Sequence, residues 1–241
     1  MIEKCEFSSV RLSCNVITAR IKALDMAYRD SIGIDFYRQI TDGRITAVFG
    51  GMDSSYTLTV FEGADFGELK SFFSLSSATV FCFADTADRL CAKETAVSRL
   101  YEFCGDISLN SDDAHGKMSD VYLKLKQGED GDINMPPFEF WYTDFCVRFN
   151  HSAAEYALLE NAVAVAGFMT DEATLITGVA TETDRRGKGV GSRALQQLLS
   201  NIKKKYPHSR VFAATCNADE FYIKNGFAEV GKVAVCEFRS I

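Results

Sequence analysis

The sequence predicts an α/β protein of the α+β class, in which helices flank a mixed, mostly antiparallel sheet in two similar lobes. Three observations lead to this prediction. Hydrophobic residues make up 47% of the 241 positions and charged residues 24%, as in ordinary globular proteins. Short runs with the two-residue period of strands recur along the chain. In each half, three such runs precede a helical pattern and one further strand.

The first half opens with a helical pattern, because Ile17, Ile21, Leu24 and Tyr28 recur at helical spacing. Three strands should follow as a meander, since turn residues separate them. We predict these strands at 34–40, 44–49 and 56–61.

A second helix of the first half should begin at Asp65, a favourable cap residue with Glu68 three positions later. This helix would bury an apolar face, and a strand at 78–83 would complete the lobe. The residues expected on that face are Phe66, Leu69, Phe72 and Phe73.

A polar, turn-rich stretch at 105–137 joins the halves. Within it, Val121, Leu123 and Leu125 alternate with polar residues, which predicts a strand at 119–126. We place a boundary near residue 130, between an N-terminal lobe at 1–130 and a C-terminal lobe at 131–241.

The second half repeats the order of the first. The elements predicted are strands at 155–159, 162–168 and 175–181, a helix with Leu195, Leu198, Leu199 and Ile202 on its apolar face, and strands at 211–215 and 232–238. The two halves differ in the connection from third strand to helix, which is short in the first half and glycine-rich in the second. Chemistry is therefore expected in the second half.

Composition excludes several classes of function. Residues 1–135 carry 14 basic and 21 acidic side chains and residues 136–241 carry 12 of each, so phosphate neutralisation alone does not favour nucleic-acid binding. The apolar stretch Ala162–Met169 is too short to span a membrane, and no signal peptide is visible. The eight cysteines form no C-x-x-C pair and the three histidines are scattered, which predicts reduced thiols, no metal site and a cytoplasmic protein.

The glycine-rich connection runs from Arg185 to Gly191 and leads into the helix that should start near Val190. Three glycines in five residues let backbone N–H groups approach a ligand closely. The open N–H groups and partial positive charge of a helix N-terminus lie at the same place, beside three cationic side chains. Together they predict an anion site suited to a pyrophosphate.

Three phosphate motifs compete for this segment. A Walker loop is excluded because none of its glycines is followed by Lys-Ser or Lys-Thr. A dinucleotide fingerprint fits Gly189, Gly191 and Ala194, but the acidic residue it needs about 20 positions later is missing. The remaining pattern, R-x-x-G-x-G, is matched by Arg186, Gly189 and Gly191.

The segment 177–191 resembles the acyl-CoA-binding segment of the GNAT N-acetyltransferase superfamily. A second similarity lies at the distance usual in the family, where Asn217 is followed by Tyr222 and by Gly226-Phe227. The resemblance covers about 138–241 and implies the GNAT acyltransferase fold for that part. The first half matches only in its order of elements, like a degenerate, GNAT-like lobe of a two-lobed member.

The resemblance implies roles for individual residues. Acetyl-CoA would be the co-substrate, and Tyr222 would donate a proton to its departing sulfur. Glu182 is our first candidate for the general base, ahead of His151, Asp144 and ordered water. The residues expected to bind the co-substrate are Val179, Ala180, Thr181, Arg186, Gly187, Lys188, Gly189, Val190, Gly191, Ser192 and Asn217.

Plainer roles stay open for some of these residues. Tyr222 can be a core residue, Asn217 a helix cap, and Glu182 a solvated acid that balances Arg185 and Arg186. Trp141 and Tyr142 can line an acceptor pocket or be buried between the lobes. The lysines at 203–205 are expected to close a helix.

The leading function is transfer of an acetyl group from acetyl-CoA to an amine of a small molecule or peptide by direct attack, which needs no enzyme nucleophile. The acidic first lobe would form one wall of the acceptor site, a weak indication of a cationic amine. A non-catalytic acyl-CoA-binding module is the alternative, and an RNA-binding protein is disfavoured by charge. No membrane partner is expected, and a homodimer stays open.

Overall fold

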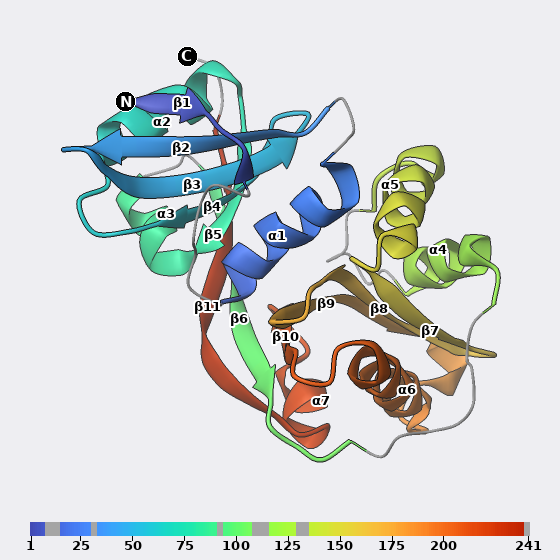
Figure 1. The fold of residues 1–241 in the computed structure, drawn as a ribbon. Coiled ribbons are helices and arrows are strands. Elements are labelled where there is room, and N and C mark those ends of the chain that lie inside the picture. The colour runs from blue at the N-terminus through green and yellow to red at the C-terminus, as the bar shows by residue number, and fades with distance from the viewer. Residues whose placement is uncertain (8–14, 30–32, 91–93, 108–115, 129–134, 239–241) are drawn as a thin grey trace.

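The structure is a computed structural model that describes residues 1–7, 15–29, 33–90, 94–107, 116–128 and 135–238 (Figure 1). Its strands are β1 Ile2–Lys4, β2 Asp35–Thr41, β3 Arg44–Met52, β4 Ser55–Val60, β5 Thr79–Phe83, β6 Glu94–Phe103, β7 Glu155–Leu159, β8 Ala162–Met169, β9 Ala173–Thr181, β10 Arg210–Thr215 and β11 Phe227–Glu237. Its α-helices are α1 Val16–Tyr28, α2 Phe66–Leu75, α3 Ala84–Leu90, α4 Met118–Gln127, α5 Phe138–Asn150, α6 Val190–Lys205 and α7 Asp219–Lys224, and a 3-10 turn covers Thr183–Arg185.

All described strands form one sheet of 11 strands, in the order β1-β2-β3-β4-β5-β11-β6-β10-β9-β8-β7. Neighbouring strands are antiparallel except for two parallel pairs, β4 with β5 and β9 with β10. The predicted mixed, mostly antiparallel sheet is therefore confirmed. Each parallel pair follows a meander and is connected through a helix, so both halves have the predicted strand–strand–strand–helix–strand order.

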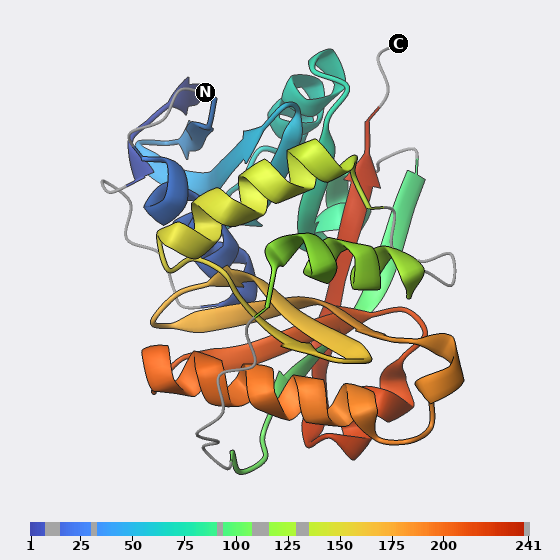
Figure 2. The ribbon, with the colours of Figure 1, turned by 90° about the vertical axis from the view of Figure 1, so that its right-hand side faces the viewer.

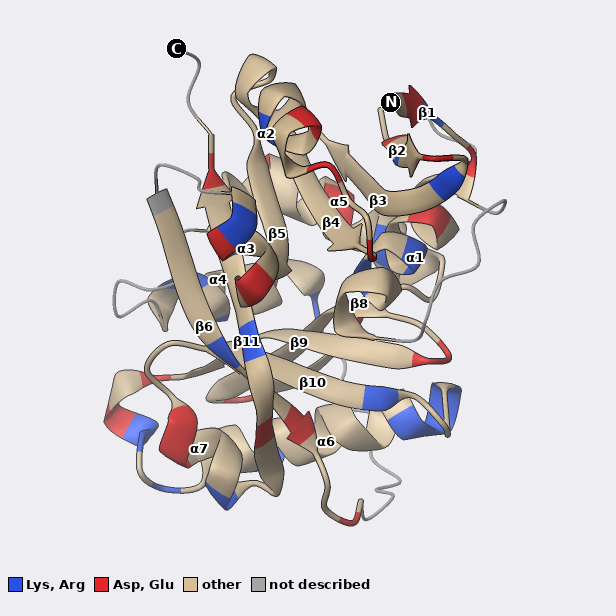
Figure 3. Cartoon of the chain, turned by 90° about the vertical axis from the view of Figure 1, so that its left-hand side faces the viewer, with Lys and Arg blue, Asp and Glu red and all other residues tan. Residues whose placement is uncertain are grey.

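The two halves exchange strands at the centre of the sheet. Strand β6 belongs to the first half of the chain but lies between β10 and β11 of the second. Strand β11 in turn lies between β5 and β6 of the first half. Figure 3 shows the long β6–β11 pair running from one lobe into the other. The predicted boundary near 130 lies outside the described residues and stays a prediction.

Helices cover both faces of the sheet (Figure 2). In the second lobe α6 and α7 cover one face, where Leu195, Leu198 and Tyr222 are buried. Helices α4 and α5 cover the other face, and Trp141 and Phe145 are buried there. Helix α1 packs on strands of both lobes, since its buried residues contact β5 as well as β9 and β10. It therefore holds the two lobes together.

The strand predicted at 119–126 is wrong, because this segment lies within helix α4. Val121 and Leu125 are four positions apart and both buried, whereas Leu123 is 53% exposed. Hydrophobic residues at every second position satisfied the strand pattern, but only two of the three face the core. The sequence patterns also predicted no element at β1, α3, β6 or α5.

Helix α2 begins as predicted, with the Asp65 side chain accepting a hydrogen bond from Glu68 N at 3.0 Å. Of its expected apolar face, Leu69 and Phe73 are fully buried, and Phe66 and Phe72 are partly buried against the same core. The Glu68 carboxylate does not return to the cap. It instead accepts from Ile2 N and from the Gln39 amide.

Candidate functional site

The parallel strands β9 and β10 separate midway along their length. Their pairing begins at Ala173 with Arg210 and ends at Ile176 with Ala213, although both strands continue. Beyond this point β9 has no pairing with β10, and residues 178–181 are paired only with β8. Ligands of open α/β sheets bind beyond the carboxyl ends of parallel strands. The separation of β9 and β10 is such a place.

A β-bulge in β9 marks the point of separation. Val165 of β8 pairs with Gly178 and Ala166 pairs with Ile176, so Thr177 is an extra residue without a partner in the ladder. On β8, Gly167 lies opposite Thr177 and also has no partner in the register. A Cβ atom on Gly167 would lie 2.6 Å from the Thr177 hydroxyl oxygen. A bulge turns backbone groups away from the ladder, and bulges are over-represented next to active sites.

The glycine-rich connection joins the end of β9 to α6 and has the backbone that its glycines predict. Gly187 and Gly189 have φ values of +73° and +74°, in the left-handed region that favours glycine. Gly191 faces the end of β9, since a Cβ atom there would lie 2.7 Å from the Thr181 hydroxyl oxygen. The first two glycines therefore shape the turn, and the third lets the helix approach the strand.

The N-terminus of α6 is not capped. Its first backbone hydrogen bond runs from Arg193 N to Gly189 O at 3.1 Å, and no side chain accepts from the first turn. The N–H groups of Val190, Gly191 and Ser192 have no acceptor within the described part of the chain. These groups and the positive end of a 16-residue helix are the elements of an anion site.

Cations surround the loop at the surface. Lys188 Nζ donates to Asp184 O at 2.9 Å, and Arg186 Nε donates to Thr181 O at 3.3 Å. Arg185 pairs with Asp184 at 3.3 Å, so it is not held by Glu182. The side chains at 183–189 are exposed, so a ligand on this loop is accessible from solvent.

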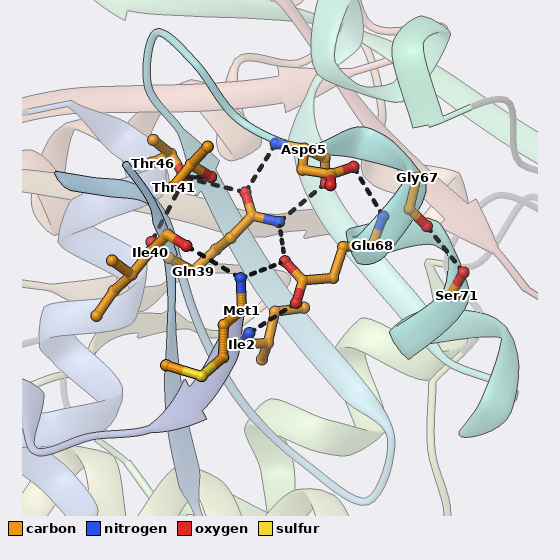
Figure 4. Close-up of polar contacts among 10 residues, drawn as sticks. All are labelled: Met1, Ile2, Gln39, Ile40, Thr41, Thr46, Asp65, Gly67, Glu68 and Ser71. Carbon is orange, nitrogen blue, oxygen red and sulfur yellow. Dashed lines mark hydrogen bonds and ion pairs between the residues drawn. The ribbon is translucent and has the colours of Figure 1, made fainter. Parts of the chain in front are cut away.

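The corresponding helix of the first lobe is closed to anions. Asp65 caps α2, Gln39 Oε1 accepts from Asp65 N at 2.9 Å, and Glu68 lies in the first turn (Figure 4). The N-terminal ammonium of Met1 lies 3.0 Å from the Glu68 carboxylate. Acids at a helix N-terminus take the place that an anionic ligand would need. The open site is therefore in the second lobe.

Tyr222 is buried in the core beneath α6, with 6% of its surface exposed. Its ring stacks on Tyr101 at a centroid distance of 6.1 Å and meets Phe227 edge-on at 5.3 Å. Burial raises the pKa of Tyr222 well above its ordinary value. Within the described residues its hydroxyl has no hydrogen-bond partner. The ring of Tyr222 is thus packed in the core, while its hydroxyl is not used in a hydrogen bond within the described residues.

Asn217 is exposed and follows the end of β10. It is not the cap of α7, because the residue at the cap position is Ala218. Thr215 Oγ1 accepts from the backbone N–H groups of Asn217 and Ala218, at 3.3 and 2.9 Å. The Asn217 side chain is therefore not used as the helix cap suggested by its residue type.

Glu182 lies directly after β9, and its carboxylate is paired with Lys124 of helix α4 at 2.6 Å. Lys124 also donates to Glu160 O. The pair lines a cavity of about 520 Å³ with residues of α4, of β7 and of the β7–β8 turn, including Asp120, Leu158 and Glu160. Lys124, which the sequence analysis did not single out, is thus the partner of the candidate base.

The weaker candidates for the base are held by other contacts. Asp144 accepts from Tyr28 OH at 2.5 Å and is paired with Arg148. His151 lies at the end of α5, with Nδ1 2.9 Å from Val147 O.

Trp141, which belongs to α5, is buried in the core that α4 and α5 form with the sheet of the second lobe. Its ring stacks on that of Phe145 at a centroid distance of 4.9 Å.

Two residues of β6, Arg99 and Tyr101, support the candidate site although no motif marks this strand. Tyr101 belongs to the exchanged strand β6, and its hydroxyl donates to Asp219 at 2.7 Å. Asp219 also pairs with Arg99 of β6. Strand β6 therefore supports α7, the helix that carries Tyr222. Because β6 joins the second lobe only through the strand exchange, spacing in the sequence could not reveal this.

Two negative findings concern the described residues alone. No helix among them is long and apolar enough to cross a membrane. No group of three or more histidine, cysteine, aspartate or glutamate side chains in the same ranges is arranged to hold a metal ion.

Comparison with known proteins gives the following similarities. Residues 148–229 match a family model described as an acetyltransferase (GNAT) domain. No curated protein matches the sequence.

Three solved structures resemble the fold over most of their length. A GNAT-family acetyltransferase from Colwellia psychrerythraea is 13% identical, with 99% of this chain and 100% of that chain covered and a TM-score of 0.50. A GCN5-related N-acetyltransferase from Sphaerobacter thermophilus is 13% identical, with 88% of this chain and 82% of that chain covered and a TM-score of 0.56. A GCN5-related N-acetyltransferase from Kribbella flavida is 11% identical, with 95% of this chain and 96% of that chain covered and a TM-score of 0.54.

Proposed function

From the match of residues 148–229 to a GNAT acetyltransferase domain, we propose that the chain is a GNAT N-acetyltransferase that moves an acetyl group from acetyl-CoA to an amine. The observation that carries the proposal is the open N-terminus of α6, placed by two left-handed glycines at the end of β9 where β9 and β10 separate. The free cysteine thiols of the described residues agree with the cytoplasmic location that we propose.

The pyrophosphate of acetyl-CoA would lie on the glycine-rich connection. The open N–H groups of 190–192 supply donors, and Arg186 and Lys188 supply charge at the rim. Gly191 has to lack a side chain because Thr181 occupies the space beside it. A loop with these properties fits a doubly charged, solvent-accessible group.

The pantetheine arm would enter the gap between the separated strands. From Thr177 to Thr181, β9 has no partner strand on the β10 side, so its backbone groups on that edge can bond to the amides of the arm. Val179 and Thr181 lie on the α6 face of β9, and Ala180 lies on the opposite face, under α4. Asn217 follows the end of β10, on the other side of the gap.

Acetyl-CoA would supply the thioester, an acyl group already activated for attack by an amine. In the transfer, a nitrogen–carbon bond forms as the carbon–sulfur bond breaks, and the sulfur leaves as a thiolate. Tyr222 would donate its hydroxyl proton towards that thiolate, whose pKa is about 8.5 when free. Glu182, or water that it orders, would take the proton that the amine loses.

Calorimetric titration with acetyl-CoA tests this proposal. The native protein should bind at one site per chain, and Gly189→Glu should abolish binding by placing a carboxylate beside the pyrophosphate. Gly43→Glu is the matched control, since Gly43 has the same φ of +74° and equally open surroundings but lies in the β2–β3 turn. Failure of the native protein to bind, or equal loss in both variants, would refute the proposed site.

A further inference from the structure

Helix α1 places an arginine at the junction of the lobes. The guanidinium carbon of Arg20 lies 4.5 Å from the ring centroid of Phe81 and 4.2 Å from that of Phe168. Phe81 belongs to β5 in the first lobe and Phe168 to β8 in the second. The guanidinium is thus held between one aromatic ring from each lobe, which fixes its position and orientation.

Arg20 has no anionic partner among the described residues. Its Nε atom is inaccessible to solvent and makes no hydrogen bond. Burial and the nearby Arg148 lower the pKa of Arg20 to about 9, so it is still protonated at neutral pH. A buried cation without a partner is costly, and buried charges are normally paired. Arg20 as a residue is half-buried, so part of its surface is open to solvent although Nε is not.

Arg20, Arg148 and Asp144 together carry one positive charge in excess. The Arg148 guanidinium carbon lies 4.7 Å from the Phe168 centroid, and Arg148 is paired with Asp144. Tyr28 contributes a neutral hydroxyl to the same carboxylate. Lys22, also on α1, is paired with Asp171 at 3.0 Å and with Glu172 at 3.3 Å. The cluster of Arg20, Arg148 and Asp144 therefore matches a single negative charge.

Contacts through β8 link this cluster to the gap proposed for the pantetheine arm. Arg148 donates to Gly167 O, one residue before Phe168. Gly167 lies against Thr177, the bulged residue where β9 and β10 separate. Arg20 and Arg148 share the Phe168 ring, and Arg148 reaches the strand opposite the bulge, on the α1 and α5 side of the sheet. An acceptor approaching the thioester from this side would meet Arg20.

We propose that Arg20 binds a carboxylate of the acceptor, which is then an amine that also carries a carboxylate, as amino acids and peptides do. This assignment rests on the proposed acetyl transfer and names its substrate class. The planar guanidinium fork fits a carboxylate in two parallel hydrogen bonds. A phosphate monoester matches less well, because its charge of about −1.5 to −2 exceeds that of the cluster.

Binding of product analogues tests the assignment without turnover. The probes are N-acetyl derivatives of glutamate, leucine, lysine, phenylalanine and serine, each as the free acid and as the neutral carboxamide, titrated by calorimetry with and without CoA. We expect at least one acid to bind about 10- to 100-fold more tightly than its amide. In Arg20→Met this preference should disappear, with the affinity for acetyl-CoA unchanged.

Two more variants complete the experiment. Arg20→Lys keeps the charge but not the fork, so it should retain part of the preference, and it serves if Arg20→Met does not fold. Lys22→Met removes a cation from the same helix and should keep the full preference. Equal affinity for acids and amides, no binding of any acid, or a preference that survives in Arg20→Met would overturn the assignment. Native protein that fails to bind acetyl-CoA would instead overturn the proposed function.

Discussion

At the scale of single residues, Tyr222 combines a packed ring with a hydroxyl that has no partner in the described structure. If it donates to the leaving sulfur, Tyr222→Phe should lower kcat by about 100-fold and leave the affinity for acetyl-CoA unchanged. Steady-state kinetics and calorimetry measure the two effects. Tyr206→Phe is the control, because it removes a hydroxyl from the far end of α6, where it donates to Ser152 O. A purely structural Tyr222 would leave kcat nearly unaltered.

The raised pKa of Tyr222 has a consequence for the pH profile. A group whose pKa is raised keeps its proton to higher pH, so the donor form of Tyr222 persists through the neutral and mildly alkaline range. We expect kcat to show no fall caused by loss of this proton between about pH 7 and pH 10, the ordinary tyrosine pKa. An alkaline fall in kcat that disappears in Tyr222→Phe would contradict this.

Glu182 and Lys124 form an ion pair that offers a test of the candidate base. Glu182→Gln removes both the pair and the base, whereas Lys124→Met removes only the pair. If Glu182 accepts the proton of the amine, Glu182→Gln should reduce kcat by about 100-fold and Lys124→Met by much less. Similar losses in the two variants would show that only the ion pair matters, and would leave the base to water.

Residue types and spacing were enough to locate the glycine-rich connection and its backbone. They could not reveal partners that are distant in sequence. Lys124 lies 58 positions before Glu182 and Asp219 lies 118 positions after Tyr101, and each of these contacts depends on how the elements pack. The buried Nε atom of Arg20, which makes no hydrogen bond in the described structure, is equally invisible in the sequence, because burial and hydrogen bonding depend on the fold.

At the scale of elements, α2 and α6 occupy corresponding places in the two lobes but begin differently. Asp65 and Glu68 satisfy the start of α2, while α6 starts at Gly189 with open donors. Asp65→Ala should therefore cost about 1 kcal/mol of stability, as measured by urea unfolding. The affinity for acetyl-CoA should not change, and a second binding site exposed in this variant would contradict the assignment of a single site.

Helices and strands with a strong hydrophobic period were predictable from sequence, including the meanders of both lobes and the amphipathic α6. The segment of α4 was mispredicted because three apolar residues at alternate positions fit a strand equally well. Its identity as a helix depends on packing, since Ala180 and Gly178 of β9 leave room for α4 on this face. Whether a short amphipathic segment forms a helix or a strand depends on such tertiary contacts more than on its own hydrophobic pattern.

At the scale of the whole molecule, the exchange of β6 and β11 makes each lobe depend on the other. Fragments 1–130 and 131–241, separated at the predicted boundary, should not fold alone, because β6 pairs only with β10 and β11 and would lose both. Mixed together, the fragments should recover native circular dichroism and acetyl-CoA binding. A cooperative thermal transition in either isolated fragment would contradict this expectation.

The order of elements in each half was evident in the sequence, but the exchange was not. A sequence pattern shows that a segment is a strand and does not show which neighbours it pairs with. Strand β6 is ten residues long and β11 eleven, long enough for each to reach into both lobes. Pairing across the halves follows from the global arrangement of the sheet, which no local pattern encodes.

The position of β11 also bears on how the protein is made and inherited. A ribosome delivers β11 after every other strand described here, so a nascent chain carries β5 and β6 without their shared neighbour until synthesis has passed residue 237. Chaperones would meet these two open strand edges during translation. A gene rearrangement that separated the halves would leave neither product complete, so natural selection should keep both lobes in one reading frame.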